Sequence, residues 1–272
     1  MTALAELFRN VIRQNRNLKI FGLGEKIARN YLAGYMNEDA FDPRKDGELN
    51  LIRLSKEFFK DKDIIVFDIG SHHGDWAVLL KHTLPNSVCH CFEIVPQTFG
   101  VLSERISSYK ELVLNNIGLS DSKKEIQITY FPNQDSGSSI QPLPWKLETM
   151  TVTCQVMSGD QYCKERNIVE IDFMKIDVEG HELSVLKGFS ELLKASKITL
   201  VQFEYGLTFI PPRVTLGDVY NLLVPYGYRI GRLYPTGVEF KQYDMLRDEH
   251  FRMGNYVAVH QSADRLLQQI KL

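Results

Sequence analysis

The fold of this chain is decided by the stretch IIVFDIGSHHGDW, which occupies residues 64–76. The apolar run at its start predicts a buried strand from Ile64 to Ile69, and a helical pattern follows from Asp75. Between them, Gly70 and Gly74 allow a tight turn in which the backbone approaches a ligand closely, because glycine has no Cβ. The stretch therefore predicts a strand, a ligand-binding turn and a helix.

A second predicted strand carries the other half of a nucleoside site. It ends at Glu93, 25 residues after Asp68, where doubly wound folds place the acid that binds a ribose diol. The helix start after the turn offers free N–H groups and the positive end of a dipole, which suit a carboxylate. Asp68 suits a ligand ammonium group. S-adenosylmethionine combines ammonium, carboxylate, ribose and adenine, and is the nucleoside that this pattern favours.

Two other interpretations of the turn stay open. A dinucleotide site typically has G-x-G-x-x-G in the first turn, and that spacing is missing here. An ordinary βαβ unit could also use its glycines for the turn alone. His72 and His73 lie in the turn, and contacts to cofactor or substrate are favoured over a metal there because no third ligand is evident.

The composition is that of one large α/β domain with a small extension. The chain has 272 residues, of which 44% are hydrophobic and 24% charged, and its formal net charge is −2. This charge argues against a basic nucleic-acid-binding face. No apolar run has the length of a transmembrane helix, and the N-terminus lacks the apolar region of a secretory signal. We therefore expect no nucleic-acid partner, no transmembrane segment and a cytoplasmic location.

Cysteine spacing indicates neither zinc nor redox chemistry. None of the four cysteines forms a C-x-x-C pair. Cys89 and Cys91 share one face of a predicted strand and are expected to be small core residues.

The chain divides into two predicted parts. Residues 1–60 are expected to form a helical N-terminal extension, interrupted by a loop at 41–48, and residues 61–272 a Rossmann-like domain. The extension could cap the cofactor site, form a homo-oligomer contact or lie on a membrane surface. The membrane interpretation rests on basic residues that lie near apolar ones, namely Arg9, Arg13, Arg16 and Lys19. A solvated helix face is the preferred explanation of these basic residues.

Strands and helices alternate through the second part, which predicts a parallel sheet with helices on both faces. The strand at 198–204 is expected to be central because it is almost continuously apolar. Strands at 125–131 and 150–156 are expected to be antiparallel, around a Ser/Gly-rich loop at 135–139. The remaining predicted strands are 88–93, 112–116, 173–177, 228–233 and 256–260, and the predicted helices are 75–82, 96–107, one carrying Leu183, Leu186 and Leu193, and 216–223.

Polar residues at the carboxyl ends of the strands are the candidates for chemistry, because ligands bind there in open α/β sheets. Asp177, His181 and Glu204 could orient an acceptor or remove its proton. Glu204 ends a hydrophobic strand, where an unpartnered carboxylate is costly. Glu179 is equally compatible with stabilising a helix N-terminus. We assign no metal, although oxygen ligands at this place could hold a divalent cation.

The chain resembles the FkbM family of S-adenosylmethionine-dependent methyltransferases over residues 48–260. Residues 67–74 resemble the family's first methyltransferase motif, and residues 171–188 resemble its most distinctive segment. Residues 201–206 and 255–260 resemble its final strands. The family usually has Ala-Asn where this chain has Ser71-His72, so the contact to the methionine end differs in detail. It usually has Leu-Asp where this chain has Gly159-Asp160.

The resemblance implies a class I methyltransferase fold, an α/β Rossmann-like seven-stranded sheet with an antiparallel last strand. It implies S-adenosyl-L-methionine as cofactor and methyl transfer to oxygen, as a carbohydrate modification of a sugar, glycan or related natural product. A nucleotide-linked sugar is one candidate acceptor. On this basis Asp177, His181 and Glu204 are the expected catalytic residues, and the expected cofactor-binding residues are Asp68, Gly70, Ser71, His72, Gly74, Glu93, Asn116, Ser120 and Asp121, with the turn at 118–121 near adenine.

Four other functions stay open at this point. The chain could be a methyltransferase-fold protein that binds without catalysis, a nicotinamide oxidoreductase, or a methyltransferase for an amine or carboxylate of a small molecule. The missing G-x-G-x-x-G counts against the oxidoreductase. A nucleic-acid methyltransferase would more often show a basic face and an Asn/Asp-Pro-Pro-aromatic motif, and the sequence has neither.

Overall fold

The computed structural model describes residues 3–38, 42–60, 62–133, 137–141, 144 and 146–272. Asp135 and Ser136 of the Ser/Gly-rich loop lie outside the described residues. The chain forms two compact units, Met1–Asp39 and Ala40–Leu272. Among the described residues, no helix combines the length and the apolar character needed to cross a membrane.

The first unit consists of two helices, α1 (Ala3–Gln14) and α2 (Lys19–Tyr35), joined by a turn at 15–18. Neither helix has a buried residue. Both helices lie in the part of the chain for which a helical extension was expected, and they lack a core of their own.

The second unit alternates helices and strands. Its helices are α3 (Glu48–Phe59), α4 (Asp75–Thr83), α5 (Pro96–Ile106), α6 (Gly159–Arg166), α7 (Glu182–Lys187), α8 (Ser190–Lys194), α9 (Leu216–Leu223), α10 (Met245–Asp248) and α11 (Asp264–Ile270). Its strands are β1 (Ile64–Ile69), β2 (Ser87–Phe92), β3 (Leu112–Asn115), β4 (Gly118–Ser120), β5 (Lys124–Tyr130), β6 (Met150–Ser158), β7 (Ile171–Ile176), β8 (Ile198–Tyr205), β9 (Tyr228–Tyr234), β10 (Gly237–Phe240) and β11 (Gly254–His260).

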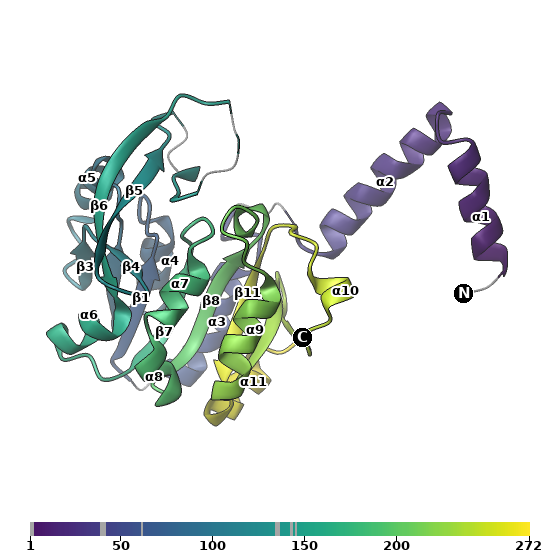
Figure 1. Cartoon of the computed structure of the whole chain (residues 1–272). Helices are drawn as coiled ribbons and strands as arrows, with labels where there is room; N and C mark the ends of the chain where they lie inside the picture. The colour runs from purple at the N-terminus through teal and green to yellow at the C-terminus, as the bar shows by residue number, and fades with distance from the viewer. Residues whose placement is uncertain (1–2, 39–41, 61, 134–136, 142–143, 145) are drawn as a thin grey trace. The chain divides into compact units, whose positions relative to one another are not determined.

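The large sheet has the order β10-β9-β11-β8-β7-β1-β2-β3. Strands β3, β2, β1, β7 and β8 are parallel to one another, whereas β11 runs antiparallel to both β8 and β9. Figure 1 shows these strands side by side with helices packed on the sheet. The predicted class I methyltransferase sheet with an antiparallel last strand is confirmed, and β8 lies in its interior as expected.

Two features differ from the predicted strand pattern. Strand β10 adds an eighth, antiparallel strand at the edge next to β9. Residues 118–121 were predicted to form a turn, but Gly118–Ser120 forms strand β4. Strand β4 pairs with β6 in a separate three-stranded sheet of order β4-β6-β5. The expected antiparallel pairing of β5 with β6 is confirmed. Both new strands have only three or four residues, which is too short for a detectable period.

Each face of the large sheet has its own hydrophobic core. On one face, α3, α4 and α11 pack together, and their buried residues include Leu51, Trp76 and Leu266. On the other, Leu186 and Leu223 of α7 and α9 join a core that also contains residues of α6 and α8. Burial on both faces explains why apolar residues predominate in β1, β7 and β8.

Helix α3 belongs to the second unit, because it packs against α4 and α11. The boundary between the units lies at Asp39–Ala40, whereas the sequence pattern suggests a boundary after residue 60. Cys89, Cys91, Cys154 and Cys163 are all buried free thiols, which agrees with the predicted core role of the first two.

Candidate functional site

The turn after β1 depends on its glycines. Gly70 and Gly74 have φ angles of +86° and +81°, a region that residues with a Cβ rarely adopt. A Cβ on Gly70 would lie 1.8 Å from the carbonyl oxygen of Asp177. The turn therefore packs directly against the chain leaving β7, and the two segments lie side by side at the carboxyl edge of the sheet.

Asp68 is a buried carboxylate with no hydrogen-bond partner among the described residues. It is fully buried, and both side-chain oxygens lack a partner. Burial raises the pKa of Asp68 to about 6, and the charge of Lys175 opposes that rise. Because an unpaired buried carboxylate is costly, a cationic ligand group at this point would stabilise it. The hydroxyl of Ser71 donates to the backbone oxygen of Asp68 at 2.7 Å and fixes the turn.

Glu93 connects the first turn to the end of β2. Its Oε2 accepts a hydrogen bond from the His72 amide at 3.0 Å, and its Oε1 accepts one from the Val95 amide at 2.8 Å. These two hydrogen bonds tie the Glu93 carboxylate to the turn after β1 and to the chain leaving β2. The side-chain amide of Asn116 donates to the Glu93 carbonyl at 2.8 Å and holds the backbone behind it. Glu93, His72 and Asn116 are thus brought together.

His72 and His73 stack on each other in the turn, with ring centroids 3.7 Å apart. His72 has a φ angle of +47°, so the residue that departs from the family's usual Asn adopts the left-handed conformation that Asn also tolerates.

Ser120, Asp121 and His181 form a second polar group. The Ser120 hydroxyl lies 2.9 Å from His181 Nε2 and donates to Asp121 Oδ1 at 3.2 Å. Since the hydroxyl has a single hydrogen, donation to Asp121 requires His181 to carry its hydrogen on Nε2. Burial, together with the charge of Lys124, lowers the pKa of His181 to about 4. His181 is therefore a neutral imidazole near pH 7 that joins the end of β4 to the start of α7.

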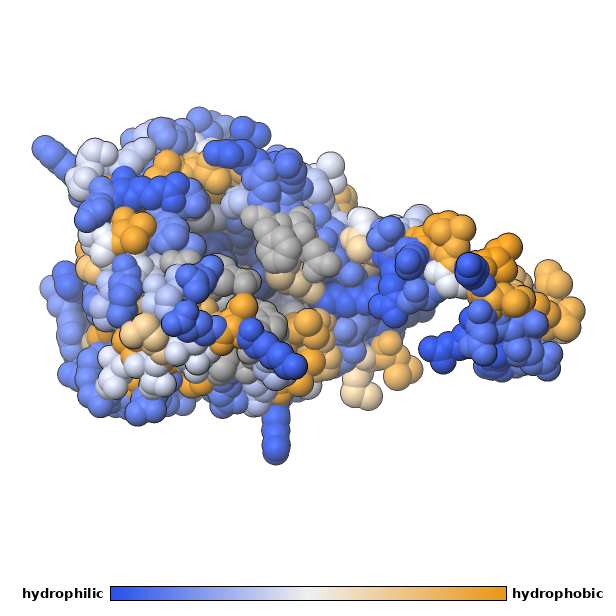
Figure 2. Space-filling view, turned by 90° about the horizontal axis from the view of Figure 1, so that it is seen from above, coloured by the Kyte–Doolittle hydropathy of each residue, from blue (hydrophilic) through white to orange (hydrophobic). Residues whose placement is uncertain are grey.

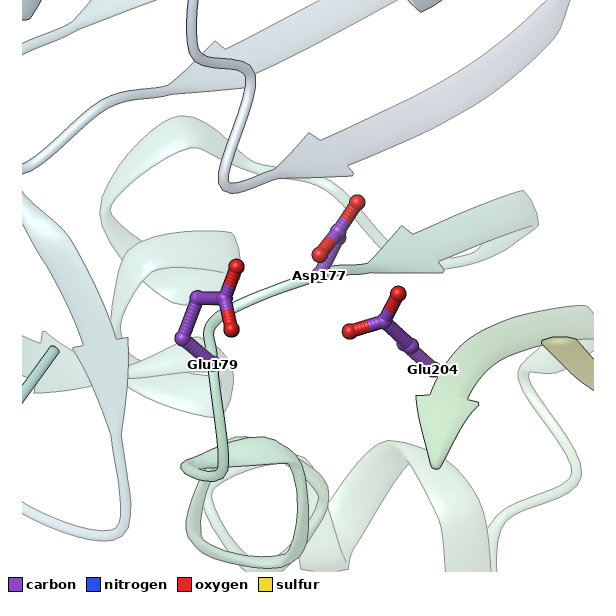
Figure 3. A group of neighbouring side chains, drawn as sticks. All are labelled: Asp177, Glu179 and Glu204. Atoms are coloured by element: carbon purple, nitrogen blue, oxygen red, sulfur yellow. The ribbon is translucent and has the colours of Figure 1, made fainter. Parts of the chain in front are cut away.

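Three carboxylates meet at the carboxyl ends of β7 and β8. Asp177, Glu179 and Glu204 each place an oxygen within 4.8 Å of the other two, and Figure 3 shows the three side chains pointing toward one another. The structure thus brings together two of the predicted catalytic residues, Asp177 and Glu204, and places the third, His181, on Ser120 instead.

Asp177, Glu179 and Glu204 form a carboxylate cluster, and burial together with acidic neighbours favours protons on two of its members, Glu179 and Glu204. Burial, reinforced by the charges of Asp177 and Glu182, raises the pKa of Glu179 to about 8. The pKa of Glu204 is raised well above its usual range, first by burial and then by its acidic neighbours. A carboxyl group whose pKa is raised in this way holds its proton near neutral pH and is a stronger base once that proton has left. Oxygen ligands at this spacing could also hold a divalent cation.

Lys175 is a buried cation that serves this cluster and has no role among the sequence-based predictions. Its Nζ donates to Asp177 Oδ2 at 2.8 Å. Burial would lower the pKa of Lys175, but the charges of Asp177, Glu48 and Asp68 outweigh burial and raise it. A lysine inside the fully buried strand β7 was the available signal, because a buried charge requires partners.

The sequence is compatible with two roles for Glu179, and its backbone distinguishes them. Its φ angle is +54°, which is unfavourable for a residue with a long side chain. The loop is held there because Glu182 Oε1 accepts from the amides of Val178 and Gly180 at 3.1 and 3.3 Å. Glu182 thus stabilises the loop, while Glu179 points into the cluster.

Comparison with known proteins finds methyltransferases among the similar sequences. The sequence profile described as "Methyltransferase FkbM domain" matches residues 68–230. Hexuronic acid methyltransferase AglP of Haloferax volcanii is 31% identical over 163 residues, which are 59% of this chain and 64% of that protein. The chain therefore spans less than two thirds of AglP. The 2-O-methyltransferase NoeI of Sinorhizobium fredii is 23% identical over 207 residues, which are 70% of this chain and 83% of that protein.

Among solved structures, the precorrin-6y C5,15-methyltransferase of Geobacter metallireducens is similar with a TM-score of 0.42 and 11% identity. The similarity covers 78% of this chain and 85% of that one.

Proposed function

Because the chain belongs to the FkbM methyltransferase family, we propose that it is an S-adenosyl-L-methionine-dependent O-methyltransferase that modifies a hydroxyl of a sugar or glycan. The observation that carries this proposal is the meeting of the Asp177, Glu179 and Glu204 carboxylates beside the turn after β1. A binding turn and a group of proton acceptors then share one edge of the sheet.

The residues of the first turn fit a cofactor with a cationic amino group and a ribose. Asp68 provides a buried carboxylate with two unpartnered oxygens, which suits an ammonium group. Gly70 and Gly74 carry no side chain at the two ends of the turn and adopt the positive φ angles that it requires. Glu93 provides a carboxylate whose acceptor positions suit two hydroxyls. Asn116, Ser120 and Asp121 follow along the same edge, where the adenine is expected, and Ser71 and His72 shape the turn.

The catalytic work left to the protein is to orient the acceptor and take up its proton. When bound, S-adenosyl-L-methionine supplies an already activated methyl group. A sugar hydroxyl is a weak nucleophile, so a positioned base assists as its oxygen forms the new bond to carbon. Asp177, Glu179 and Glu204 provide that base. Lys175 fixes the Asp177 carboxylate at 2.8 Å, and His181 positions the loop through Ser120.

A hexuronic acid or a related sugar is the acceptor class that the relatives support. AglP is named for hexuronic acid and NoeI for 2-O-methylation. We propose a nucleotide-linked sugar as one form of the acceptor. We also propose a cytoplasmic location and a homo-oligomeric state.

Methyl transfer to defined acceptors tests the proposal. The purified full chain is incubated with S-adenosyl-L-methionine and a panel of free, nucleotide-linked and glycan-bound hexuronic acids and neutral hexoses, and mass spectrometry follows a gain of one methyl group. The expected result is an O-methylated sugar together with S-adenosylhomocysteine. Transfer to amines or carboxylates alone, with every sugar unreacted, would contradict it.

A further inference from the structure

The two N-terminal helices leave their apolar faces uncovered. On α1 and α2, large hydrophobic side chains are between 39% and 75% exposed; they are Leu4, Leu7, Phe8, Val11, Ile20, Leu23, Ile27, Tyr31, Leu32 and Tyr35. Figure 2 shows hydrophobic residues, in orange, gathered on this unit beside hydrophilic ones in blue. A soluble monomer rarely exposes such a continuous set, so these faces have a partner.

The spacing of these residues places most of them on one face of each helix. Leu4, Leu7, Phe8 and Val11 follow the i, i+3, i+4, i+7 pattern of an amphipathic helix. Ile20, Leu23, Ile27 and Tyr31 with Tyr35 continue the same pattern along α2, and the tyrosines combine an apolar ring with a polar tip, as side chains at a membrane interface do.

The polar sides of both helices are basic. Cations are more numerous than acids between residues 3 and 35, where the cations are Arg9, Arg13, Arg16, Lys19, Lys26 and Arg29. The two acids are already engaged, Glu6 with Arg13 and Glu25 with Arg29. Arg9, Arg16, Lys19 and Lys26 have no acidic partner among the described residues. The unit therefore offers an apolar face flanked by uncompensated positive charge.

We propose that α1 and α2 bind flat on a lipid surface that contains anionic headgroups. Apolar side chains enter the boundary of the acyl region while basic side chains meet the headgroups, as in other interfacial amphipathic helices. A second copy of this unit would satisfy the apolar faces but would bring the same cations together. Charge complementarity therefore favours the anionic lipid.

The glycines of α2 indicate a helix whose stability depends on burial against a surface. A Cβ added to Gly22, Gly24 or Gly34 would meet no atom within 4 Å, so no close packing requires glycine there. Each lowers the intrinsic stability of a helix. Helices of 12 and 17 residues without tertiary packing are marginal in water, and a lipid surface would supply the missing burial.

Vesicle binding of the full chain tests this proposal. Sedimentation is measured with vesicles of phosphatidylcholine alone and of phosphatidylcholine with 30 mol% (roughly the charge of an anionic membrane) phosphatidylglycerol, at low and high salt. We expect binding to the anionic vesicles, at least about tenfold stronger than to the neutral ones, and weaker binding at high salt because the charges are screened.

Three variants separate the contributions. Leu7→Asn with Ile27→Asn disrupts the apolar faces and should reduce anionic-vesicle binding about tenfold or more. Ala33→Asn places the same side chain on the polar side of α2 and should leave binding unchanged. Lys19→Gln with Lys26→Gln should weaken binding and flatten its salt dependence. Because α1 and α2 bury no residue, the melting temperature of the second unit should be the same in all variants.

Other occupants of the apolar faces give different results, each of which overturns the proposal. A concentration-dependent dimer that the Leu7→Asn and Ile27→Asn variant abolishes, without vesicle binding, would identify a second copy. A monomer that binds no vesicles, and whose melting temperature falls in that variant, would show that the helices cover the chain's own second unit. Equal binding to neutral and anionic vesicles would remove the role of the charges.

Discussion

Asp177 and Glu204 follow or end two adjacent parallel strands, and their carboxylate oxygens lie within 4.8 Å of each other. The register of β7 with β8 pairs Ile176 with Phe203, so the residues that come next along each strand emerge side by side. Glu179 completes the group from the loop after β7. Burial and the neighbouring acids raise the pKa of Glu179 and Glu204, and a carboxylate whose pKa is raised is a stronger base once it is ionised.

Replacing Asp177 tests the role of the cluster in turnover. We expect Asp177→Asn to lower kcat about 100-fold or more, because a positioned base is lost, while affinity for S-adenosylhomocysteine changes only a few-fold. Steady-state kinetics and calorimetry measure the two quantities. Glu170→Gln is the matched control, since Glu170 is an exposed acid near the other end of the same strand. Turnover that survives in Asp177→Asn would exclude Asp177 as the base.

Replacing Asp68 should separate cofactor affinity from stability. We expect Asp68→Asn to weaken S-adenosylhomocysteine binding about 10- to 100-fold, because a charge-assisted hydrogen bond to the ligand amine is lost. The unliganded protein should melt at the same or a higher temperature, because the buried Asp68 carboxylate has no hydrogen-bond partner among the described residues. A large fall in melting temperature with unchanged affinity would instead make Asp68 a structural residue.

The turn after β1 should not accept a side chain. A Cβ on Gly70 would lie 1.8 Å from the Asp177 oxygen at a φ angle of +86°, so we expect Gly70→Ala to destabilise the protein by several kcal/mol or to prevent folding. Gly100→Ala is the control, because Gly100 lies in α5 with nothing within 4 Å and should gain up to ~1 kcal/mol. Urea denaturation measures both. Equal stability of the two variants would refute the packing described for the turn.

The raised pKa of Glu179 predicts a pH dependence of stability. In the folded state this carboxyl keeps its proton to about pH 8, whereas the ordinary value is 4.5. Its contribution to the free energy of unfolding is therefore fully present below about 4.5 and is lost as the pH rises toward 8, because the folded state binds more protons in that window.

Urea denaturation across this pH range measures the effect. The free energy of unfolding of Glu179→Gln should fall less between pH 4.5 and 8 than that of the wild type. Glu170→Gln again serves as control and should follow the wild type. Parallel pH profiles for Glu179→Gln and the wild type would mean that Glu179 titrates normally.

The sequence predicts the large sheet well because its strands are long and buried. Apolar runs such as 64–69 and 198–204 are decisive when both faces of a sheet are covered. The short strand β10 was missed because Val238 is its single fully buried hydrophobic residue, and one residue sets no period. Helix α6 was missed because it is largely polar; its first turn is held by Ser158, which accepts from the Gln161 amide at 3.2 Å.

The positions of the candidate site residues follow from the sequence where a polar residue directly ends a buried strand. Asp68, Glu93 and Glu204 stand at strand ends, where the topology brings polar groups together. The role of His181 was not predictable, because its partner Ser120 lies 61 residues away along the chain. Gly159 stands where the family usually has Leu, and the ring of Phe189 fills that space, with ring atoms 2.2 to 2.4 Å from a Cβ position. A contact of this kind, between residues that are far apart along the chain, cannot be predicted from the sequence pattern.

The central claim is that this edge of the sheet binds S-adenosyl-L-methionine. Calorimetric titration of the purified chain with S-adenosylhomocysteine, repeated with NAD and with the Asp68→Asn variant, tests it most directly. We expect binding in the micromolar range to S-adenosylhomocysteine alone, and weaker binding in the variant. Binding of NAD, or no binding of S-adenosylhomocysteine by a folded protein, would contradict it.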